Sequence, residues 1–286
     1  MKETELITNT DGSIFHLYLK PGELAEKIII VGDPGRVEMI GKKLESIRTR
    51  RNNREFFTIT GFYRGKEISV ISSGIGTDNI DILINEIDAL FNINLTSGQP
   101  LAERKSLSFV RLGTSGGLQA DLQPGQAVIS EKAIGFDAVM NYYSGIESIS
   151  DLRFESEFIR HTSWSERLPY PYIINCSNEL LKKFSDTGFI KGMTISTPGF
   201  YAPQGRTLFL TPHDKELNNK IMSFRYEGRR ILNYEMESSA IYGLSALLGH
   251  KAITICAAIG NRVTGKFASN YKSVMSDLAD RVLEII

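Results

Sequence analysis

Short runs of apolar residues recur along the chain, and several of them end at a glycine or a serine. Such runs are typical of strands that are buried on both faces of a sheet. We expect strands at residues 27–32, 67–73, 108–113, 126–130 and 252–260. Between them, apolar residues at helical spacing predict helices over residues 77–91, 235–248 and 271–286. This alternation favours an α/β fold with a mixed central β-sheet that is flanked by helices.

Two stretches between these elements show neither an apolar run typical of a strand nor helical spacing, and they are expected to be loops. Residues 94–105 are polar, whereas residues 141–172 contain clustered aromatic residues with glycine and proline. Loops this long are usually functional or mobile. Because there is no internal repeat and no clear linker, we expect residues 1–286 to form a single domain with insertions at these two places. Thr77 or Asp78 is expected to cap the first helix.

The composition excludes several classes of protein. The chain has 33 Lys plus Arg against 33 Asp plus Glu, with 42% apolar and 23% charged residues. This balance excludes a disordered chain and removes a charge-driven affinity for nucleic acid. No signal peptide and no apolar run of about 20 residues is visible, so we expect no membrane segment and a cytoplasmic location.

The metal-binding residue types give no sign of a metal site. Cys176 and Cys256 are too few for a disulfide framework or a four-ligand zinc site, and Cys256 is expected to be a small buried residue. The four histidines form no HExxH pattern and no close pair. His16, taken alone, is expected to be a half-buried structural histidine.

Glycine-rich segments with an arginine follow two of the expected strands. Ligands of α/β sheets bind beyond the carboxyl ends of the strands, so both segments are candidates for a site. Residues 32–36 (GDPGR) combine close approach of the backbone with the charge of Arg36. Residues 111–117 (RLGTSGG) place Arg111 beside two hydroxyls, which suits phosphate oxygens. Residues 111–117 match neither the P-loop nor the GxGxxG fingerprint, and an ordinary turn is the alternative for each segment.

Residues 200–206 (FYAPQGR) could recognise a heterocyclic base. Phe200 could stack on a planar ring, while Gln204 and Arg206 could hydrogen-bond its edge. The alternative is an exposed turn with ordinary polar residues.

Two further segments carry charge near the end of an expected strand or the start of a helix. In residues 233–238 (NYEMES), two carboxylates flank Met236, where they could accept from sugar hydroxyls. Acidic residues that complement a helix dipole are the alternative. Arg262 follows the most apolar strand, at the sheet edge where ligands collect.

Together these segments resemble the nucleoside phosphorylase family of the hexameric bacterial type. The resemblance extends from about residue 15 to the C-terminus. Its eight motifs, in the family's order, are FHL (15–17), VGDPGRV (31–37), NREF (53–56), SSGIG (72–76), RLGTSGG (111–117), FYAPQGR (200–206), NYEMES (233–238) and NR (261–262). One short motif would be weak evidence, whereas eight in order are specific.

The resemblance implies a role for each matching residue. The residues that would bind phosphate are Gly32, Arg36, Arg111 and Thr114, joined by Arg54 from a neighbouring subunit. Those that would hold the ribose are Met236 and Glu237, joined by His16 from the partner. Those that would bind the base are Phe200, Gln204 and Arg206, and the catalytic residues would be Gln204, Arg206 and Arg262.

The resemblance also implies a reaction, the reversible phosphorolysis of uridine to uracil and ribose 1-phosphate, with no cofactor. Purine-specific relatives place an aspartate after the last core strand, where this chain has Asn261, so a pyrimidine base is favoured. The alternatives are a phosphorylase of another nucleoside (thymidine, deoxyuridine or a purine) and a non-catalytic nucleoside-binding relative.

The implied partners are uridine, phosphate and further copies of this chain, with no nucleic acid and no membrane. Sites shared between subunits require a homo-oligomer, at least a dimer and, in this family type, up to a hexamer. A monovalent cation site at the dimer interface would fall on Glu55, Ile75 and Asn79, where Asn79 replaces the family's serine.

Overall fold

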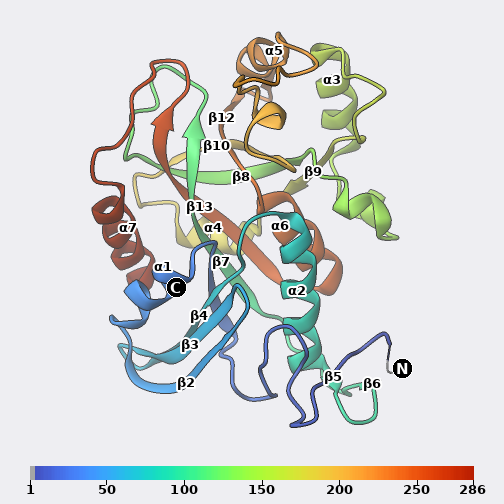
Figure 1. The fold of residues 1–286 in the computed structure, drawn as a ribbon, viewed down its shortest axis with the longest axis vertical. Helices are drawn as coiled ribbons and strands as arrows, with labels where there is room; N and C mark the ends of the chain where they lie inside the picture. The colour runs from blue at the N-terminus through green and yellow to red at the C-terminus, as the bar shows by residue number, and fades with distance from the viewer. Residues whose placement is uncertain (1–3) are drawn as a thin grey trace.

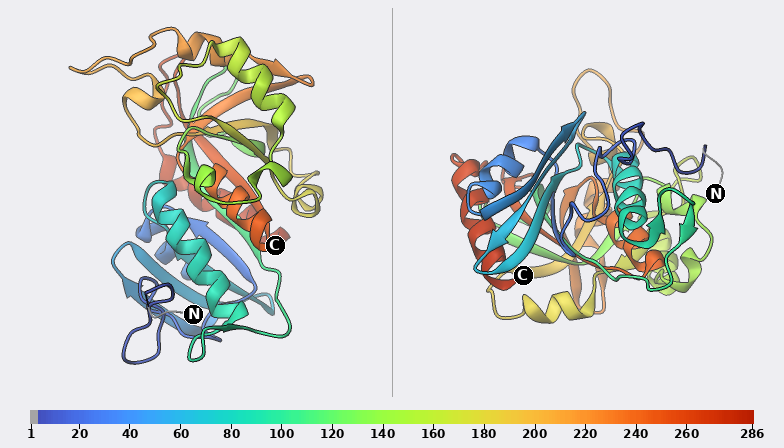
Figure 2. Two further views of the ribbon diagram at one scale, coloured as in Figure 1. Left: turned by 90° about the vertical axis from the view of Figure 1, so that its right-hand side faces the viewer. Right: turned by 90° about the horizontal axis from the view of Figure 1, so that it is seen from below.

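In a computed structural model, which describes residues 4–286, eleven strands build one mixed sheet with helices on both of its faces, and two short strands form a separate pair (Figures 1 and 2). The strands are β1 (Lys27–Val31), β2 (Glu45–Asn53), β3 (Phe56–Tyr63), β4 (Lys66–Ser72), β5 (Ile93–Asn94), β6 (Gln99–Pro100), β7 (Ser108–Gly117), β8 (Ala127–Gly135), β9 (Tyr172–Asn175), β10 (Ile190–Ser196), β11 (Arg225–Tyr226), β12 (Arg229–Glu235) and β13 (Lys251–Asn261). The α-helices are α1 (Pro34–Gly41), α2 (Thr77–Asn92), α3 (Leu152–Thr162), α4 (Asn178–Lys183), α5 (Leu217–Ser223), α6 (Ser238–Leu248) and α7 (Tyr271–Ile285). The short 3-10 helices are η1 (Val139–Tyr142), η2 (Ile146–Ser148) and η3 (Ala202–Gln204).

The sheet closes on itself around the strands that carry the glycine-rich motifs. Its order is β11-β12-β10-β8-β13-β7-β1-β4-β3-β2, and β9 pairs with β8. β12 also pairs antiparallel with β7, with Tyr234 opposite Gly116. The strands β12, β10, β8, β13 and β7 therefore form a closed ring, which brings the end of β12 beside the glycine-rich end of β7.

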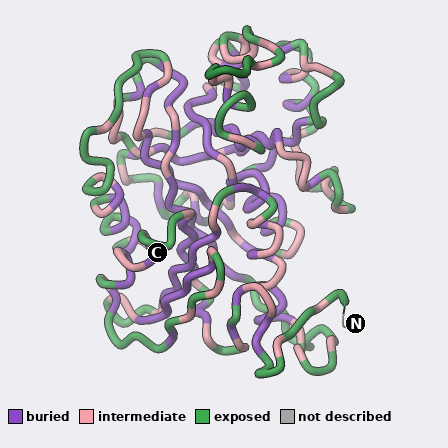
Figure 3. Tube along the Cα trace, in the orientation of Figure 1, coloured by how far each residue is buried: buried purple, intermediate pink, exposed green. Residues whose placement is uncertain are grey.

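The core lies where the central strands meet the helices, and the buried part of the chain follows these strands (Figure 3). β1 is parallel to both of its neighbours, β4 and β7, and all of its apolar side chains are buried. Helices α2 and α6 pack together on one side of the sheet, and α1 and α7 lie on the other (Figure 1). In α2 the predicted apolar stripe faces inward, as Ile80, Leu83, Ile84 and Ile87 are buried. This mixed α/β arrangement confirms the predicted fold class.

All five predicted strands and all three predicted helices are present, with shifted ends. β7 continues to Gly117, so the glycine-rich segment that was expected to follow the strand belongs to it, and the alternative of an ordinary turn does not hold there. Helix α6 begins at Ser238, three residues after the predicted start, because Glu235 still belongs to β12. The predicted cap of α2 was wrong: the N-cap residue is Gly76, with φ of 100°, and no side chain caps the helix.

The two predicted loops contain secondary structure. Residues 94–105 take part in the short antiparallel pair of β5 and β6. Residues 141–172 include η2 and the whole of α3, whose N-terminus is capped by the side chain of Asp151. The prediction of a continuous loop was therefore wrong there. No helix within residues 4–286 is long and apolar enough to cross a membrane.

Candidate active site

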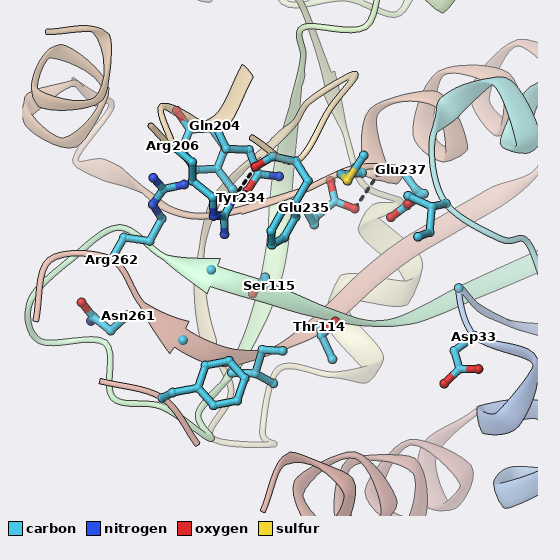
Figure 4. Close-up of a pocket in the computed structure, with 18 of the residues that line it drawn as sticks. Asp33, Thr114, Ser115, Gln204, Arg206, Tyr234, Glu235, Glu237, Asn261 and Arg262 are labelled. Carbon is cyan, nitrogen blue, oxygen red and sulfur yellow. Dashed lines mark hydrogen bonds between the residues drawn. The ribbon is translucent and has the colours of Figure 1, made fainter. Parts of the chain in front are cut away.

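A cavity of about 720 Å³ opens where β1, β4, β7, β10, β12 and β13 end (Figure 4). This is the edge of an α/β sheet at which ligands usually bind. Of the residues predicted for the site, those that line the cavity are Gly32, Arg36, Arg111, Thr114, Phe200, Gln204, Arg206, Met236, Glu237 and Arg262. His16 and Arg54 do not line it.

Arg36 and Arg111 supply positive charge at the end of the cavity next to β1. Arg36 lies in the first turn of α1, after Asp33, whose carboxylate accepts from the N–H of Gly35 and caps the helix. Burial and the like charge of Arg111 lower the pKa of Arg36 from its ordinary value. Arg111 is buried and Arg36 is half-buried, and their mutual repulsion favours a ligand that brings negative charge between them.

The guanidinium of Arg111 occupies a space that only glycine leaves open. A Cβ atom at Gly113 would lie 2.1 Å from Arg111 Nη1 and 2.8 Å from Cys256 Sγ. Cys256 is buried, as predicted, and Arg111 Nη1 donates to its sulfur at 3.1 Å. The absence of a side chain at Gly113 therefore determines where the guanidinium of Arg111 lies.

Two buried carboxylates hold Arg111 from the other side. Arg111 pairs with Glu237 and lies 3.2 Å from Glu235, and all three side chains are buried. Burial alone would lower the pKa of Arg111, but the charges of Glu237 and Glu235 raise it, so the guanidinium stays protonated. Burial raises the pKa of Glu237, and Arg111 opposes that rise. Arg111 Nε is buried without a hydrogen-bond partner within residues 4–286, so a donor remains for a ligand.

The two glutamates of residues 233–238 have different structural roles. Glu235 accepts from the backbone N–H groups of Glu237 and Ser238, which begin helix α6, so the alternative of a helix-capping carboxylate holds for it. Glu237 instead accepts, at 2.8 Å, from the N–H of Gly76, the N-cap residue of α2. Of the two carboxylates, the family resemblance assigned only Glu237 to the ribose.

Gln204 and Arg206 form a hydrogen-bonded pair at the opposite end of the cavity. Arg206 Nη1 donates to Gln204 Oε1 and to the carbonyl of Phe200, and its guanidinium lies 3.6 Å from the centroid of the Phe200 ring. Arg206 therefore covers one face of the ring that was predicted to stack on a base. Burial and the charge of Arg262 lower the pKa of Arg206 to about 10, so it is still a cation at neutral pH.

Arg262 lies beside Arg206 at the same end of the cavity (Figure 4). Its Nη1 atom is buried and has no hydrogen-bond partner in the part of the chain that the structure describes. The guanidinium lies 5.8 Å from the centroid of the Tyr234 ring. A buried donor without a partner is costly, so this end of the cavity favours a ligand with acceptor oxygens.

Arg54 and His16 lie outside the cavity and close to each other in the fold. Arg54 is exposed in the turn between β2 and β3, 5.9 Å from the ring of Phe15. His16 is half-buried, as predicted; its Nδ1 pairs with Glu86, and its carbonyl accepts from Asn53. The distances within one chain do not test their assignment to a neighbouring subunit, which stays a prediction.

Comparison with known proteins shows the family to which the chain belongs. Residues 26–286 match the family model of the phosphorylase superfamily. The chain belongs to the phosphorylase superfamily.

Superfamily relatives align over most of this chain and include enzymes of two substrate classes. A uridine phosphorylase from Thermococcus kodakarensis is 28% identical, over 96% of this chain and 87% of that protein. A purine nucleoside phosphorylase (DeoD-type) from Listeria monocytogenes is 25% identical, over 89% of this chain and 90% of that protein. A crystal structure of a Trypanosoma brucei nucleoside phosphorylase, described as showing uridine phosphorylase activity, superposes with a TM-score of 0.86. It is 29% identical, and the superposition covers 98% of both chains.

Several residues that line the cavity were given no role by the family resemblance. Tyr234 and Glu235 line the cavity from within the quoted NYEMES motif, so the motif itself was the signal. Lys266 and Phe267 line it from the segment after β13, which folds back so that Phe267 pairs with Gly260. That segment is polar and has no periodicity, and we see no sequence signal for its contact with the cavity.

The three residues of the predicted cation site lie near one another. A Cβ atom at Gly74 would lie 2.6 Å from Asn79 Nδ2 and 3.0 Å from Glu55 Cγ. Asn79 Nδ2 donates to the carbonyl of Ile75, at 3.4 Å, which leaves its Oδ1 as the oxygen for a cation. Monovalent cation binding here stays a prediction.

Proposed function

We propose that this phosphorylase superfamily member catalyses the reversible phosphorolysis of uridine to uracil and ribose 1-phosphate. The observation that carries the proposal is the distribution of charge in one cavity. Arg36 and Arg111 line the end next to β1, where Glu237 pairs with Arg111. Arg206 and Arg262 lie with Gln204 at the other end, away from Glu237 (Figure 4). A nucleoside with phosphate has the same order of groups: an anion, a sugar with hydroxyls, and a base with carbonyl oxygens.

Phosphate would bind between Arg36 and Arg111, with the hydroxyl of Thr114 on the same wall of the cavity. Bidentate guanidinium contacts suit phosphate oxygens. Arg111 is already paired with Glu237, so phosphate would share this guanidinium with the carboxylate rather than displace it. The two carboxylates would then limit how much negative charge the site accepts.

The reaction would proceed through direct attack of a phosphate oxygen on C1′ of the ribose. The C1′–N1 bond breaks as the new C1′–O bond forms, and the electrons of the broken bond leave with uracil. The proton of HPO₄²⁻ is transferred, in the net reaction, to N1 of uracil. Glu237 and Met236 would hold the ribose in line between the two ends, as positioning of reactants requires.

Arg206, Arg262 and Gln204 would stabilise the departing base. Negative charge develops on the uracil carbonyl oxygens in the transition state, and donors that are already oriented lower its free energy. The unpartnered Nη1 of Arg262 supports this role, because it is a buried donor with no acceptor in the described chain. No cofactor enters this scheme.

The surroundings of Asn261 support a pyrimidine base over a purine. Its Nδ2 donates to two buried carbonyls, those of Gln119 at 2.8 Å and Leu122 at 2.7 Å, and its Oδ1 accepts from the N–H groups of Val263 and Thr264. An aspartate at this position would place carboxylate oxygens against the carbonyl oxygens of Gln119 and Leu122, and these acceptors would repel each other. This position therefore holds a structural amide, where purine-specific relatives are expected to use an aspartate as an acid.

We propose further that the working enzyme is a homo-oligomer, at least a dimer, in which Arg54 and His16 of one subunit complete the site of the next. Arg54 is exposed and His16 is half-buried, and neither reaches the cavity of its own chain. A role in pyrimidine salvage and a cytoplasmic location remain predictions of the same proposal.

A panel of nucleosides tests the substrate class. Uridine, deoxyuridine, thymidine, inosine and adenosine are each incubated with the protein and phosphate, and the released bases are separated and quantified. We expect uracil from uridine as the main product. Release of hypoxanthine or adenine in preference to uracil would contradict the pyrimidine assignment, and no release from any of them would favour a non-catalytic nucleoside-binding protein.

A further inference from the structure

We infer that Asn218 is a positioning residue for the base end of the cavity. This inference rests on the proposed function. Asn218 lies in α5 and does not line the cavity. Its side chain nevertheless joins two segments that do. Its Oδ1 accepts from the hydroxyl of Tyr234 at 2.8 Å, and its Nδ2 donates to the carbonyl of Gln204 at 3.2 Å.

These two bonds connect the turn that carries Gln204 and Arg206 to the end of β12. The turn consists of η3 and the two residues after it. Its backbone hydrogen bonds, from Gln204 and Arg206 to the carbonyl of Tyr201, are local and do not join it to β12, so contacts with that strand depend on side chains. Tyr234 is a firm anchor, because its side chain is buried and its backbone pairs with β7. Through Asn218, the position of the turn depends on the closed ring of the sheet.

Gly205 shows how closely Asn218 packs on the turn. Its φ is +71°, in the left-handed region, and a Cβ atom there would lie 2.2 Å from Asn218 Nδ2. Both the backbone conformation and the contact thus require glycine at this position. The side chain of Asn218 fills the space that the missing Cβ leaves.

The side-chain amide of Gln204 is oriented by Thr197, the residue after β10. Its Nε2 donates to Thr197 Oγ1 at 3.0 Å, while its Oε1 accepts from Arg206. Asn218 fixes the backbone of Gln204, and Thr197 fixes its side chain. Loss of Asn218 would therefore misplace both base-binding groups without removing either of them.

The test compares Asn218→Ala and Asn218→Asp with Asn219→Ala as a matched control. Asn219 neighbours Asn218 in α5, is exposed, and donates to Glu216 on the helix surface. Asn218→Asp keeps an acceptor for Tyr234 but replaces the donor to Gln204 with an anion. For both Asn218 variants we expect KM for uridine to rise by about tenfold or more, since a lost hydrogen bond has an effect of this size. KM for phosphate should stay within about twofold, because the far end of the cavity is untouched.

Tyr234→Phe supplies a second measurement, because it removes only the hydroxyl that donates to Asn218. If the two residues act as one unit, Tyr234→Phe should add little to the loss already caused by Asn218→Ala. Hydrogen–deuterium exchange of peptides that cover residues 197–206, measured without ligand, should be faster in Asn218→Ala than in the parent and in Asn219→Ala.

The outcomes separate this inference from the proposed function. Absence of uracil release by the unaltered protein would contradict the proposed function. The hydrogen–deuterium exchange measurement would still test whether Asn218 holds the turn in place. An active Asn218→Ala variant with unchanged KM for uridine would overturn the inference alone. Equal rises of KM for uridine and for phosphate would also overturn it, since they would indicate a general loss of structure.

Discussion

Arg206 is the residue whose loss should weaken base departure most directly. It is one of two arginines at the base end, and it stays charged at neutral pH. Removal of one preoriented donor to a developing anion typically lowers kcat by about 10²-fold or more, so Arg206→Ala should lower kcat/KM for uridine to that extent. Steady-state kinetics checks this against Arg153→Ala, which removes an exposed arginine from α3. Unchanged kinetics in Arg206→Ala would remove Arg206 from the base site.

Gly113 should be needed for phosphate rather than for the base. Gly113→Ala would place a methyl group 2.1 Å from the present position of Arg111 Nη1, so the guanidinium would have to move. We expect KM for phosphate to rise by about tenfold or more, since a misplaced charged donor loses at least one strong hydrogen bond. The matched control is Gly117→Ala in the same strand, where the added methyl group would lie 3.1 Å from a terminal methyl carbon of Leu122 and would not meet a charged group. A larger effect in the control than in Gly113→Ala would contradict this account of Arg111.

At the scale of single residues, the sequence motifs identified most side chains that face the cavity but not those that hold them. Gln204 and Arg206 were accessible to prediction, because their chemistry suits a base edge. Thr197 and Asn218 were not, since no sequence pattern shows that Thr197 bonds the side chain of Gln204 or that Asn218 bonds Tyr234. Glu235 was visible as a carboxylate, yet only the structure shows that it caps α6 and pairs with Arg111.

Glu235 links two elements, the end of β12 and the start of α6. Glu235→Ala would remove a helix cap and one carboxylate of a buried charge cluster, so we expect a loss of about 2–4 kcal/mol in the free energy of unfolding. Glu235→Gln keeps an acceptor for the helix N–H groups and should cost less. Urea denaturation measures both, with the exposed Glu227→Ala as control. Equal stability of Glu235→Ala and the unaltered protein would contradict the capping role.

Elements with continuous apolar runs were predictable, whereas elements with mixed sequences were not. β1 reads as a strand because both of its faces are buried. β10 and β12 contain polar residues such as Thr194 and Asn233, which pair with each other inside the ring, and so they lack a clear apolar run. Helix α3 was missed because its aromatic residues, which pack against Phe224 and Tyr226, suggested a loop beside the prolines.

At the scale of the whole molecule, the central structural question is whether one chain holds a complete site. If Arg54 of one subunit serves the site of the next, two inactive variants should restore each other's activity. Co-expression of Arg54→Ala with Arg206→Ala would give mixed dimers in which one of the two sites is intact. Random pairing in a symmetric dimer then predicts about a quarter of the activity of the unaltered protein.

Differently tagged subunits allow the mixed dimers to be isolated and assayed alone. Each variant purified by itself is the control and should remain at its own low activity. Mixed dimers that are no more active than the two controls would show that Arg54 and Arg206 act within one chain, or that Arg54 does not serve the site.

The most direct test of phosphorolysis is release of uracil from uridine, followed by ultraviolet absorbance, with and without added phosphate. The account predicts release that depends on phosphate and saturates with it, together with ribose 1-phosphate in equal amount to uracil. Release at the same rate without phosphate, with free ribose as the product, would contradict the account, because the arginines next to β1 would then have no substrate to bind.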